Sequence, residues 1–168
     1  MAKMNLFCGR QIVIATKHAK EKVIAPHLTK ELGLNCFVPD QLDTDLLGTF
    51  SGEVDRVDSP LDTARKKCQM AMDLMSVDLA IASEGSFGPH PNIPFIPAHE
   101  EYLLLIDKKN NWEFVVRKLE TKTNYHQITL HSTDSLPELI ALTQFPSHAL
   151  IVKKSADDAT DCIKGITQ

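Results

Sequence analysis

The segment from Thr16 to Lys22 follows the apolar run QIVIA and has the residue types that bind phosphate. A helix N-terminus offers backbone N–H groups and a partial positive charge, and nearby lysines add point charges. The segment lacks the GxxxxGK[ST] pattern of a P-loop. We predict an anion-binding turn, and the alternative is a solvated, charged first turn of a helix. The side chains that would contact the anion are Thr16, Lys17, His18, Lys20 and Lys22.

A second candidate segment is SEGSFGPHPNIPFIPA, residues 83–98, which follows the predicted strand DLAIA. A plain connection needs only a few residues, whereas this polar stretch with its prolines takes about fifteen, so we predict a functional loop. Glu84 could ligate Mg²⁺ or activate water, and Gly85 would let a ligand approach the backbone. Ser86 and His90 are predicted to contact the same ligand. The alternative for Glu84 is that it accepts backbone N–H bonds in a tight turn.

Other polar residues give weaker signals. One candidate metal site consists of two His and two Glu side chains, whose spacing matches no standard site. The alternative is that these four residues lie on the surface of a loop. The acids between residues 40 and 58 have the same two interpretations. The four cysteines contain no CxxC pair, which indicates free thiols in place of a zinc site. Cys68 is a poor nucleophile candidate because it lies on an apolar helix stripe. The candidate metal ligands are His90, His99, Glu100 and Glu101.

Helix and strand signals predict the elements that would position these side chains. Ser59 is a good N-cap and Pro60 suits the first helical position, so the clearest helix starts there. A helix that ends near Leu32 is expected to bend at Pro26 and to stop at Gly33. The apolar stripe of the clearest helix is Leu61, Ala64, Cys68, Ala71 and Met75. The expected strands are 11–15, 34–38, 78–82, 101–108, 112–119 and 148–153, with a hairpin turn at 109–111 and a further helix over 135–143.

The order of these elements predicts an α/β fold of three layers, with a mixed β-sheet and flanking helices. We expect a single domain over residues 1–154 and a polar, loosely ordered tail over 155–168. In such sheets, ligands collect outside the carboxyl ends of the strands. Both candidate segments follow such ends, so we expect them to face each other across one cleft.

Composition excludes several classes of protein. The 168 residues carry a formal net charge of −4, which does not indicate a binder of nucleic-acid polymers. The sequence contains no apolar run of about eighteen residues, so no membrane span is expected. The first residues, MAKMNLFCGR, lack the apolar region of a signal peptide, and we therefore expect a cytoplasmic protein.

The pieces resemble two families. ATKHAKEK is similar to the ATxNxxK opening of the inosine/xanthosine triphosphate pyrophosphatases, and DTARKKC and ASEGS are similar to that family's E-N-A-x-x-K-A and D-D-S-G motifs. The resemblance implies that Thr16 with Lys20 or Lys22 binds phosphates, that Asp62 and Glu84 hold Mg²⁺ or orient water, and that Lys67 meets the triphosphate. More closely, ATKHAKEKVIAP, DTDLLGTFSGEV and IASEGSFGPHPNIPFIPAHEE together resemble an uncharacterised bacterial family of unknown function.

The leading hypothesis is an ITPase-like protein that binds a phosphorylated, nucleotide-like small molecule. With Mg²⁺, Glu84, Asp62 and Lys67 would hydrolyse its phosphoanhydride. One alternative is a non-catalytic sensor with the same pocket. Another is a protein-interaction domain, for which Phe87, Phe95 and Ile96 would have to be exposed. A homodimer is compatible with each hypothesis.

Overall fold

The computed structural model describes residues 6–16, 20–39, 59–123, 125, 128–132, 136–154 and 162–168 of the chain. The chain divides into two compact units. Unit 1 contains residues 1–47, 58–85 and 101–118, and unit 2 contains residues 48–57, 86–100 and 119–168. The expected single domain over residues 1–154 stays a prediction, since compactness alone does not show whether two units fold independently. None of the described helices is long and apolar enough to span a membrane.

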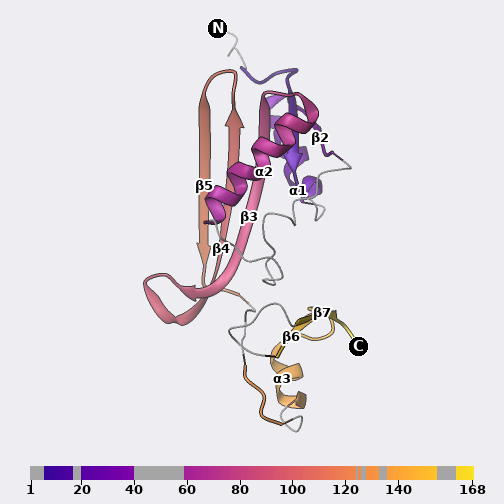
Figure 1. Cartoon of the computed structure of the whole chain (residues 1–168), viewed down its shortest axis with the longest axis vertical. Helices are drawn as coiled ribbons and strands as arrows, with labels where there is room; N and C mark the ends of the chain where they lie inside the picture. Colours follow the sequence, from indigo (N-terminus) through magenta and orange to yellow (C-terminus); the bar gives the residue numbers. More distant parts are fainter. Residues whose placement is uncertain are drawn as a thin grey trace. The chain divides into compact units, whose positions relative to one another are not determined.

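A five-stranded mixed sheet with the order β2-β1-β3-β4-β5 organises unit 1 (Figure 1). β1 is parallel to both of its neighbours, β2 and β3. Short turns connect β3 to β4 and β4 to β5, so these pairs are antiparallel hairpins. The five strands are β1 (Gln11–Ala15), β2 (Asn35–Phe37), β3 (Leu79–His90), β4 (Ile93–Asp107) and β5 (Trp112–Glu120).

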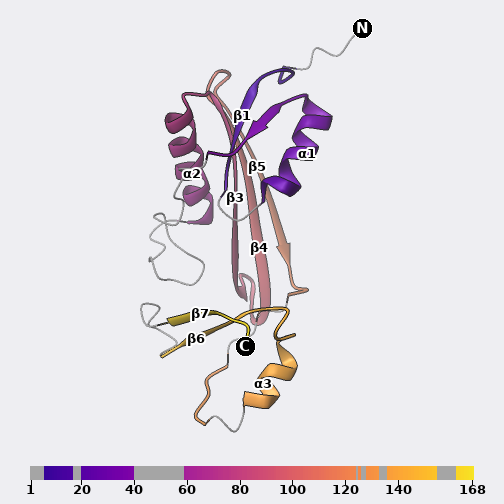
Figure 2. The same ribbon diagram turned by 90° about the vertical axis from the view of Figure 1, so that its right-hand side faces the viewer.

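Two helices, α1 (Glu21–Leu32) and α2 (Pro60–Met75), cover opposite faces of this sheet (Figure 2). Successive strand residues point to opposite faces, so β1 supplies side chains to both layers. Ile12 and Ile14 pack with α1 residues, whereas Val13 and Ala15 pack with Ala64 and other α2 residues. The predicted α/β class, with a mixed sheet between helices, is therefore confirmed.

The N-terminus of α2 has the predicted cap. Ser59 Oγ accepts a hydrogen bond from the Asp62 N–H at 3.1 Å. The predicted apolar stripe needs one correction, because Met75 is 38% exposed. Met72 is buried instead, since it stands four residues after Cys68 and shares its face of the helix. The buried residues of α2 are Thr63, Ala64, Cys68, Ala71 and Met72.

Residues 83–98, predicted as a functional loop, belong to a β-hairpin. β3 continues to His90 and β4 begins at Ile93. The turn between them is fixed by the Asn92 N–H, which donates to His90 Nδ1 at 3.1 Å. The prolines indicated a loop because proline cannot donate a ladder hydrogen bond, but a strand accommodates proline where that position faces away from its partner.

Unit 2 contains a helix, α3 (Leu136–Leu142), and a two-stranded antiparallel sheet of β6 (Leu150–Lys153) and β7 (Cys162–Ile166). α3 and β6 confirm the predicted helix and strand. β7 lies in the segment for which the sequence predicted no element. Its five residues, CIKGI, are too few for a clear alternating pattern, and Gly165 adopts φ 66° within the strand.

Arg10 connects three strands of unit 1 through a half-buried ion cluster. Its Nη1 and Nη2 atoms donate to the Asp107 carboxylate at 2.6 and 2.8 Å, and Nη2 also donates to Asp78 Oδ1 at 3.0 Å. The Asp107 side chain is fully buried. The Arg10 guanidinium, together with hydrogen bonds from Asn110, lowers the pKa of Asp107 to about 2. The cluster therefore ties the start of β1 to the start of β3 and the end of β4.

The Asp107 carboxylate should make stability depend on acid pH. Its folded pKa lies below its unfolded value, so its contribution is present above about pH 4 and is lost as the pH falls toward 2. We expect the free energy of unfolding, measured by urea titration, to fall by about 2 kcal/mol over this window from this group. Asp107→Asn should be less stable at neutral pH and should show a shallower dependence below pH 5. An unchanged pH dependence in Asp107→Asn would contradict this role.

Candidate functional site

A polar cluster forms where the turn after β1 meets β3. Lys20 Nζ donates to Ser83 Oγ at 2.7 Å and to Glu101 Oε1 at 2.9 Å. The Ser83 hydroxyl donates to the same Glu101 oxygen at 2.8 Å. The β1–β3 register, which pairs Ala15 with Ala82, brings the residues after β1 beside Ser83. The two candidate segments therefore do lie together, and whether they bind a ligand stays a prediction.

Other predicted residues of the β1–α1 turn are less constrained. Thr16 follows β1 directly, and its N–H donates to Ile14 O at 3.0 Å. Lys22 lies exposed in the first turn of α1. Lys17 and His18 lie outside the described residues. Of the two described lysines predicted to bind an anion, Lys20 is the one that donates a hydrogen bond to β3.

Lys67 and Glu84 form a second ion pair, on the face of the sheet that α2 covers. Ser83 and Glu84 are successive strand residues, so their side chains point to opposite faces. Ser83 contacts Lys20 at the start of α1, whereas Glu84 contacts Lys67 from α2. The Glu84 side chain is 3% exposed and that of Lys67 is 13% exposed. The predicted catalytic pair Lys67 and Glu84 is thus in contact, but across the sheet from Lys20.

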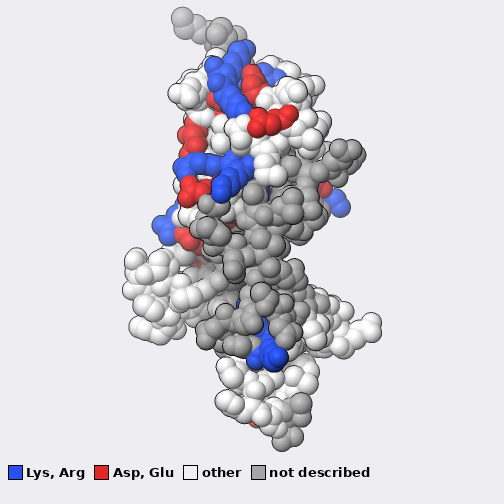
Figure 3. All heavy atoms as spheres, viewed as in Figure 1, with Lys and Arg blue, Asp and Glu red and all other residues white. Residues whose placement is uncertain are grey.

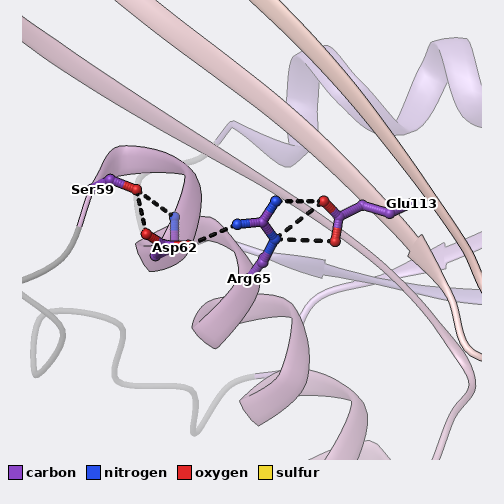
Figure 4. Close-up of polar contacts among 4 residues, drawn as sticks. All are labelled: Ser59, Asp62, Arg65 and Glu113. Carbon is purple, nitrogen blue, oxygen red and sulfur yellow. Dashed lines mark hydrogen bonds and ion pairs between the residues drawn. The ribbon is translucent and has the colours of Figure 1, made fainter.

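Asp62, predicted with Glu84 as a Mg²⁺ ligand, belongs to a different cluster at the surface (Figure 4). Its carboxylate accepts hydrogen bonds from Ser59 Oγ at 2.6 Å and from Arg65 Nη1 at 2.7 Å. These two bonds, that of Ser59 foremost, lower the pKa of Asp62. Arg65 also binds Glu113 of β5, with Nη2 at 2.7 Å from Oε1. The two predicted Mg²⁺ ligands are therefore engaged by different basic side chains.

Within the described residues, the two predicted Mg²⁺ ligands, Asp62 and Glu84, do not form a shared site. Mg²⁺ is usually held by one or two carboxylates that share a site with phosphates and waters. The Lys67 ammonium already lies against Glu84, and the Arg65 guanidinium lies against Asp62. Within the described part of the chain, no group of three or more His, Cys, Asp and Glu side chains gathers as a metal site. Glu101, one of the predicted metal ligands, forms an ion pair with Lys20.

The remaining predicted contacts on the β3–β4 hairpin divide between the units. Gly85 belongs to unit 1, whereas Ser86 and His90 belong to unit 2. In unit 2, the predicted metal ligand His99 stacks on Phe87, with ring centroids 4.3 Å apart and planes at 14°. A ligand role for Gly85, Ser86 and His90 stays a prediction.

The apolar residues of this hairpin are partly exposed, as the protein-interaction hypothesis requires. Phe95 is 86% exposed and Phe87 is 37% exposed, and Ile96 is half-buried. Phe87 also stacks with Tyr125 at a centroid distance of 6.4 Å. Phe95 is therefore the residue of the three that is open to a partner.

The cysteines match the expectation of free thiols where they are described. Cys8 is exposed, Cys36 is half-buried and Cys68 is buried, all without disulfides. Burial raises the pKa of the Cys68 thiol to about 12. A thiol that stays protonated at neutral pH is a poor nucleophile, so Cys68 is a core residue.

Comparison with protein families gives one match. A family model described as a domain of unknown function (DUF6671) matches residues 67–168, which is more than half of the chain. The chain belongs to the DUF6671 family. A search of curated proteins finds no match. The predicted membership of an uncharacterised family is thereby confirmed. The part that matches DUF6671 contains Lys67, Ser83, Glu84 and Glu101, whereas Lys20 precedes it.

Thr63, which stands one helical turn before Lys67, is not among the site residues predicted from the sequence. Thr63 is fully buried, and its hydroxyl finds no hydrogen-bond partner among the described residues. Residues four apart share a helix face, so the hydroxyl and the Lys67–Glu84 pair line the same layer of unit 1. The spacing to Lys67 was the available signal, but threonine is common inside helices as a packing residue.

Removing one partner of the buried Lys67–Glu84 pair should destabilise this DUF6671 chain. Lys67→Met leaves the Glu84 carboxylate buried without its cation, and we expect a loss of about 3 kcal/mol in the free energy of unfolding. Lys66→Met is the matched control, because Lys66 is exposed, and should change stability by less than about 0.5 kcal/mol.

Replacing both partners tests the same point from the other side. Lys67→Met combined with Glu84→Met removes both buried charges, so urea unfolding should show recovery of more than half of the single-variant loss. A double variant that is no more stable than Lys67→Met would argue against a desolvated ion pair.

Proposed function

We propose that the chain binds a phosphorylated, nucleotide-like small molecule where the β1–α1 turn meets β3. The observation that carries this proposal is the environment of Lys20. Its ammonium lies at the start of α1, between the Ser83 hydroxyl and the Glu101 carboxylate, and its side chain is 37% exposed. The positive end of the helix dipole adds to this charge. A cation and a hydroxyl at a helix N-terminus are groups that recognise phosphate.

Glu101 occupies the position on Lys20 that a ligand anion would take. A phosphate oxygen that replaced the Glu101 carboxylate would accept hydrogen bonds from both Lys20 and Ser83. Binding then exchanges one anion for another. The favourable free energy of binding is therefore smaller than it would be for a lysine without a carboxylate partner. The exchange also explains how the cation can stay partly buried without a ligand, since Glu101 compensates its charge.

The proposed ligand is a small molecule and not a nucleic-acid polymer. Lys, Arg, Asp and Glu side chains interleave on the face of unit 1 that Figure 3 displays. A polymer binder usually presents one sign of charge along a continuous surface. A single compensated lysine suits a compact phosphate group better.

Mg²⁺-dependent hydrolysis by an ITPase-like fold is the second candidate function. The observation that favours it is the contact between Lys67 and Glu84, two positions that the ITPase resemblance marks as catalytic. The three-layer arrangement of unit 1 is compatible with this fold. The same contact limits the proposal, because the Lys67 ammonium already lies against one of the two Glu84 oxygens. Ligand binding is therefore the first proposal, and hydrolysis requires a separate test.

The exchange at Lys20 predicts opposite effects on ligand affinity when each partner of the Lys20–Glu101 ion pair is replaced. Thermal-shift titrations with inosine triphosphate, xanthosine triphosphate and inorganic pyrophosphate would give the affinities. Lys20→Met should weaken binding about tenfold, because the ligand loses its cation. Glu101→Gln should strengthen binding severalfold, because the competing carboxylate is gone.

A matched control separates this site from a general charge effect. Lys30→Met removes the same charge from the far end of α1, where Lys30 is highly exposed beside Glu31. We expect affinities within about twofold of wild type for Lys30→Met. If Glu101→Gln bound no more tightly than wild type, Lys20 would not be the anion contact.

The hydrolysis candidate is tested by product release. Incubation of the wild-type chain with the same nucleotides and Mg²⁺ should release phosphate or pyrophosphate faster than Glu84→Gln, by about 100-fold or more, if Glu84 acts in catalysis. Glu84→Gln keeps the side-chain shape, and its melting temperature reports whether the fold is intact. Ligand stabilisation without any product in the wild type would leave the binding function and reject hydrolysis.

A further inference from the structure

β5 is the last strand in the order of the described sheet of unit 1 and carries an exposed apolar stripe. Trp112, Phe114 and Val116 are 40%, 49% and 61% exposed, and they point to one face. The Trp112 and Phe114 rings meet edge to face with centroids 6.0 Å apart. Residues 112–118 contain no proline, which proteins often use to protect sheet edges.

The opposite face of β5 carries charges of both signs. Glu113 binds Arg65 of α2, so the odd-numbered residues of β5 point to the α2 layer. Arg117 lies over the Tyr102 ring of β4, with its guanidinium carbon 5.9 Å from the ring centroid. Val115, between these two charges, is 42% exposed. The strand thus has an acid and a base at equal spacing on either side of Val115.

We propose that two copies of the chain associate through β5, paired antiparallel about a two-fold axis at Val115. A two-fold axis that joins two edge strands is perpendicular to the sheet, so opposed residues must come from the same face of each copy. Centred on Val115, the pairing sets Glu113 opposite Arg117 of the second copy, twice by symmetry. The same register sets Phe114 opposite Val116 and Trp112 opposite Lys118.

Each of these opposed pairs is favourable. Opposite charges and aromatic–β-branched pairs across antiparallel strands stabilise a sheet, and a lysine beside a tryptophan ring adds a cation–π contact. Glu113 can accept from Arg65 and from the second copy together, because a carboxylate has several acceptor sites. The interface would join two five-stranded sheets into one continuous sheet.

The two neighbouring symmetric registers oppose less favourable pairs of residues. The sequence of β5 therefore favours pairing with a second copy about Val115. An axis at Val116 sets Phe114 opposite Lys118 and Val115 opposite Arg117. An axis at Phe114 sets Glu113 opposite Val115. Neither of these registers pairs opposite charges. Of the three registers compared, only the one centred on Val115 places an acid of one copy opposite a base of the other.

Charge reversal tests the register in the full-length chain. Sedimentation velocity over a concentration series gives the dimer dissociation constant for each variant. Arg117→Glu and Glu113→Arg should each weaken the dimer about tenfold or more, because two attractive pairs become repulsive. The double variant, Glu113→Arg with Arg117→Glu, should return the dissociation constant to within about threefold of wild type. Lys109→Glu, a reversal in the exposed β4–β5 turn, should leave it unchanged.

Folding effects are separated from association. Glu113→Arg also places a cation beside Arg65, so its melting temperature is measured alongside. If that variant does not fold, Val115→Lys places like charges face to face on the two-fold axis and should abolish the dimer. A wild-type chain that stays monomeric up to hundreds of micromolar would overturn the proposal, whether or not another protein pairs with β5. A dimer that Arg117→Glu and Val115→Lys leave unchanged would overturn it equally.

Discussion

The burial of β3 on both faces is the constraint on which the arrangement of unit 1 depends. Leu79 to Ala82 are all buried, and their side chains alternate between the α1 and α2 layers. Beyond this apolar run, successive side chains still point to opposite faces of the sheet. Ser83 therefore points to the α1 layer and Glu84 to the α2 layer. The cation beside Ser83 is Lys20, the N-cap residue of α1, and the cation beside Glu84 is Lys67 of α2.

This division has a consequence for chemistry. The backbone of β3 separates Ser83 from Glu84, because their side chains lie on opposite faces of the sheet. The Lys20 cluster is half-exposed and suits exchange with a ligand, whereas the Lys67–Glu84 pair is buried and suits structure. Each lysine is paired with a carboxylate of the chain, Lys20 with Glu101 and Lys67 with Glu84. The resemblance to pyrophosphatases treats the two clusters as one site, and the strand geometry separates them.

Several parts of the structure followed from local sequence rules. The Ser59 cap, the stop at Gly33 and the strand QIVIA are decided by neighbouring residues, so short patterns identify them. The meeting of Lys20 with Ser83 was also predictable, because parallel strands deliver their carboxyl ends to one edge. It needed no knowledge of side-chain positions beyond the order of the elements.

Other parts depend on contacts between distant residues, which one sequence does not reveal. The Arg10–Asp107 bond joins positions 97 apart, and neither residue stands in a recognisable motif. The prolines of the β3–β4 hairpin predict a loop, because proline cannot donate a hydrogen bond to a neighbouring strand. Asp62 and Glu84 were placed together by the resemblance, but Asp62 faces solvent with Arg65, while Lys67, on the buried side of α2, reaches Glu84. Helix rotation, which the motif does not specify, decided that outcome.

β4 connects the proposed ligand site with the proposed dimer edge. Glu101 binds Lys20 on one face of β4, and the next residue, Tyr102, lies beneath Arg117 of β5 on the other face. Both contacts depend on the same two backbone positions, so a shift of β4 along its axis would disturb them together. Arg10 opposes such a shift, because it holds Asp107 at the far end of the strand with two hydrogen bonds. The Arg10 ion cluster, which the sequence did not predict, therefore helps to hold β4 in the position that both the Lys20 site and the β5 edge require.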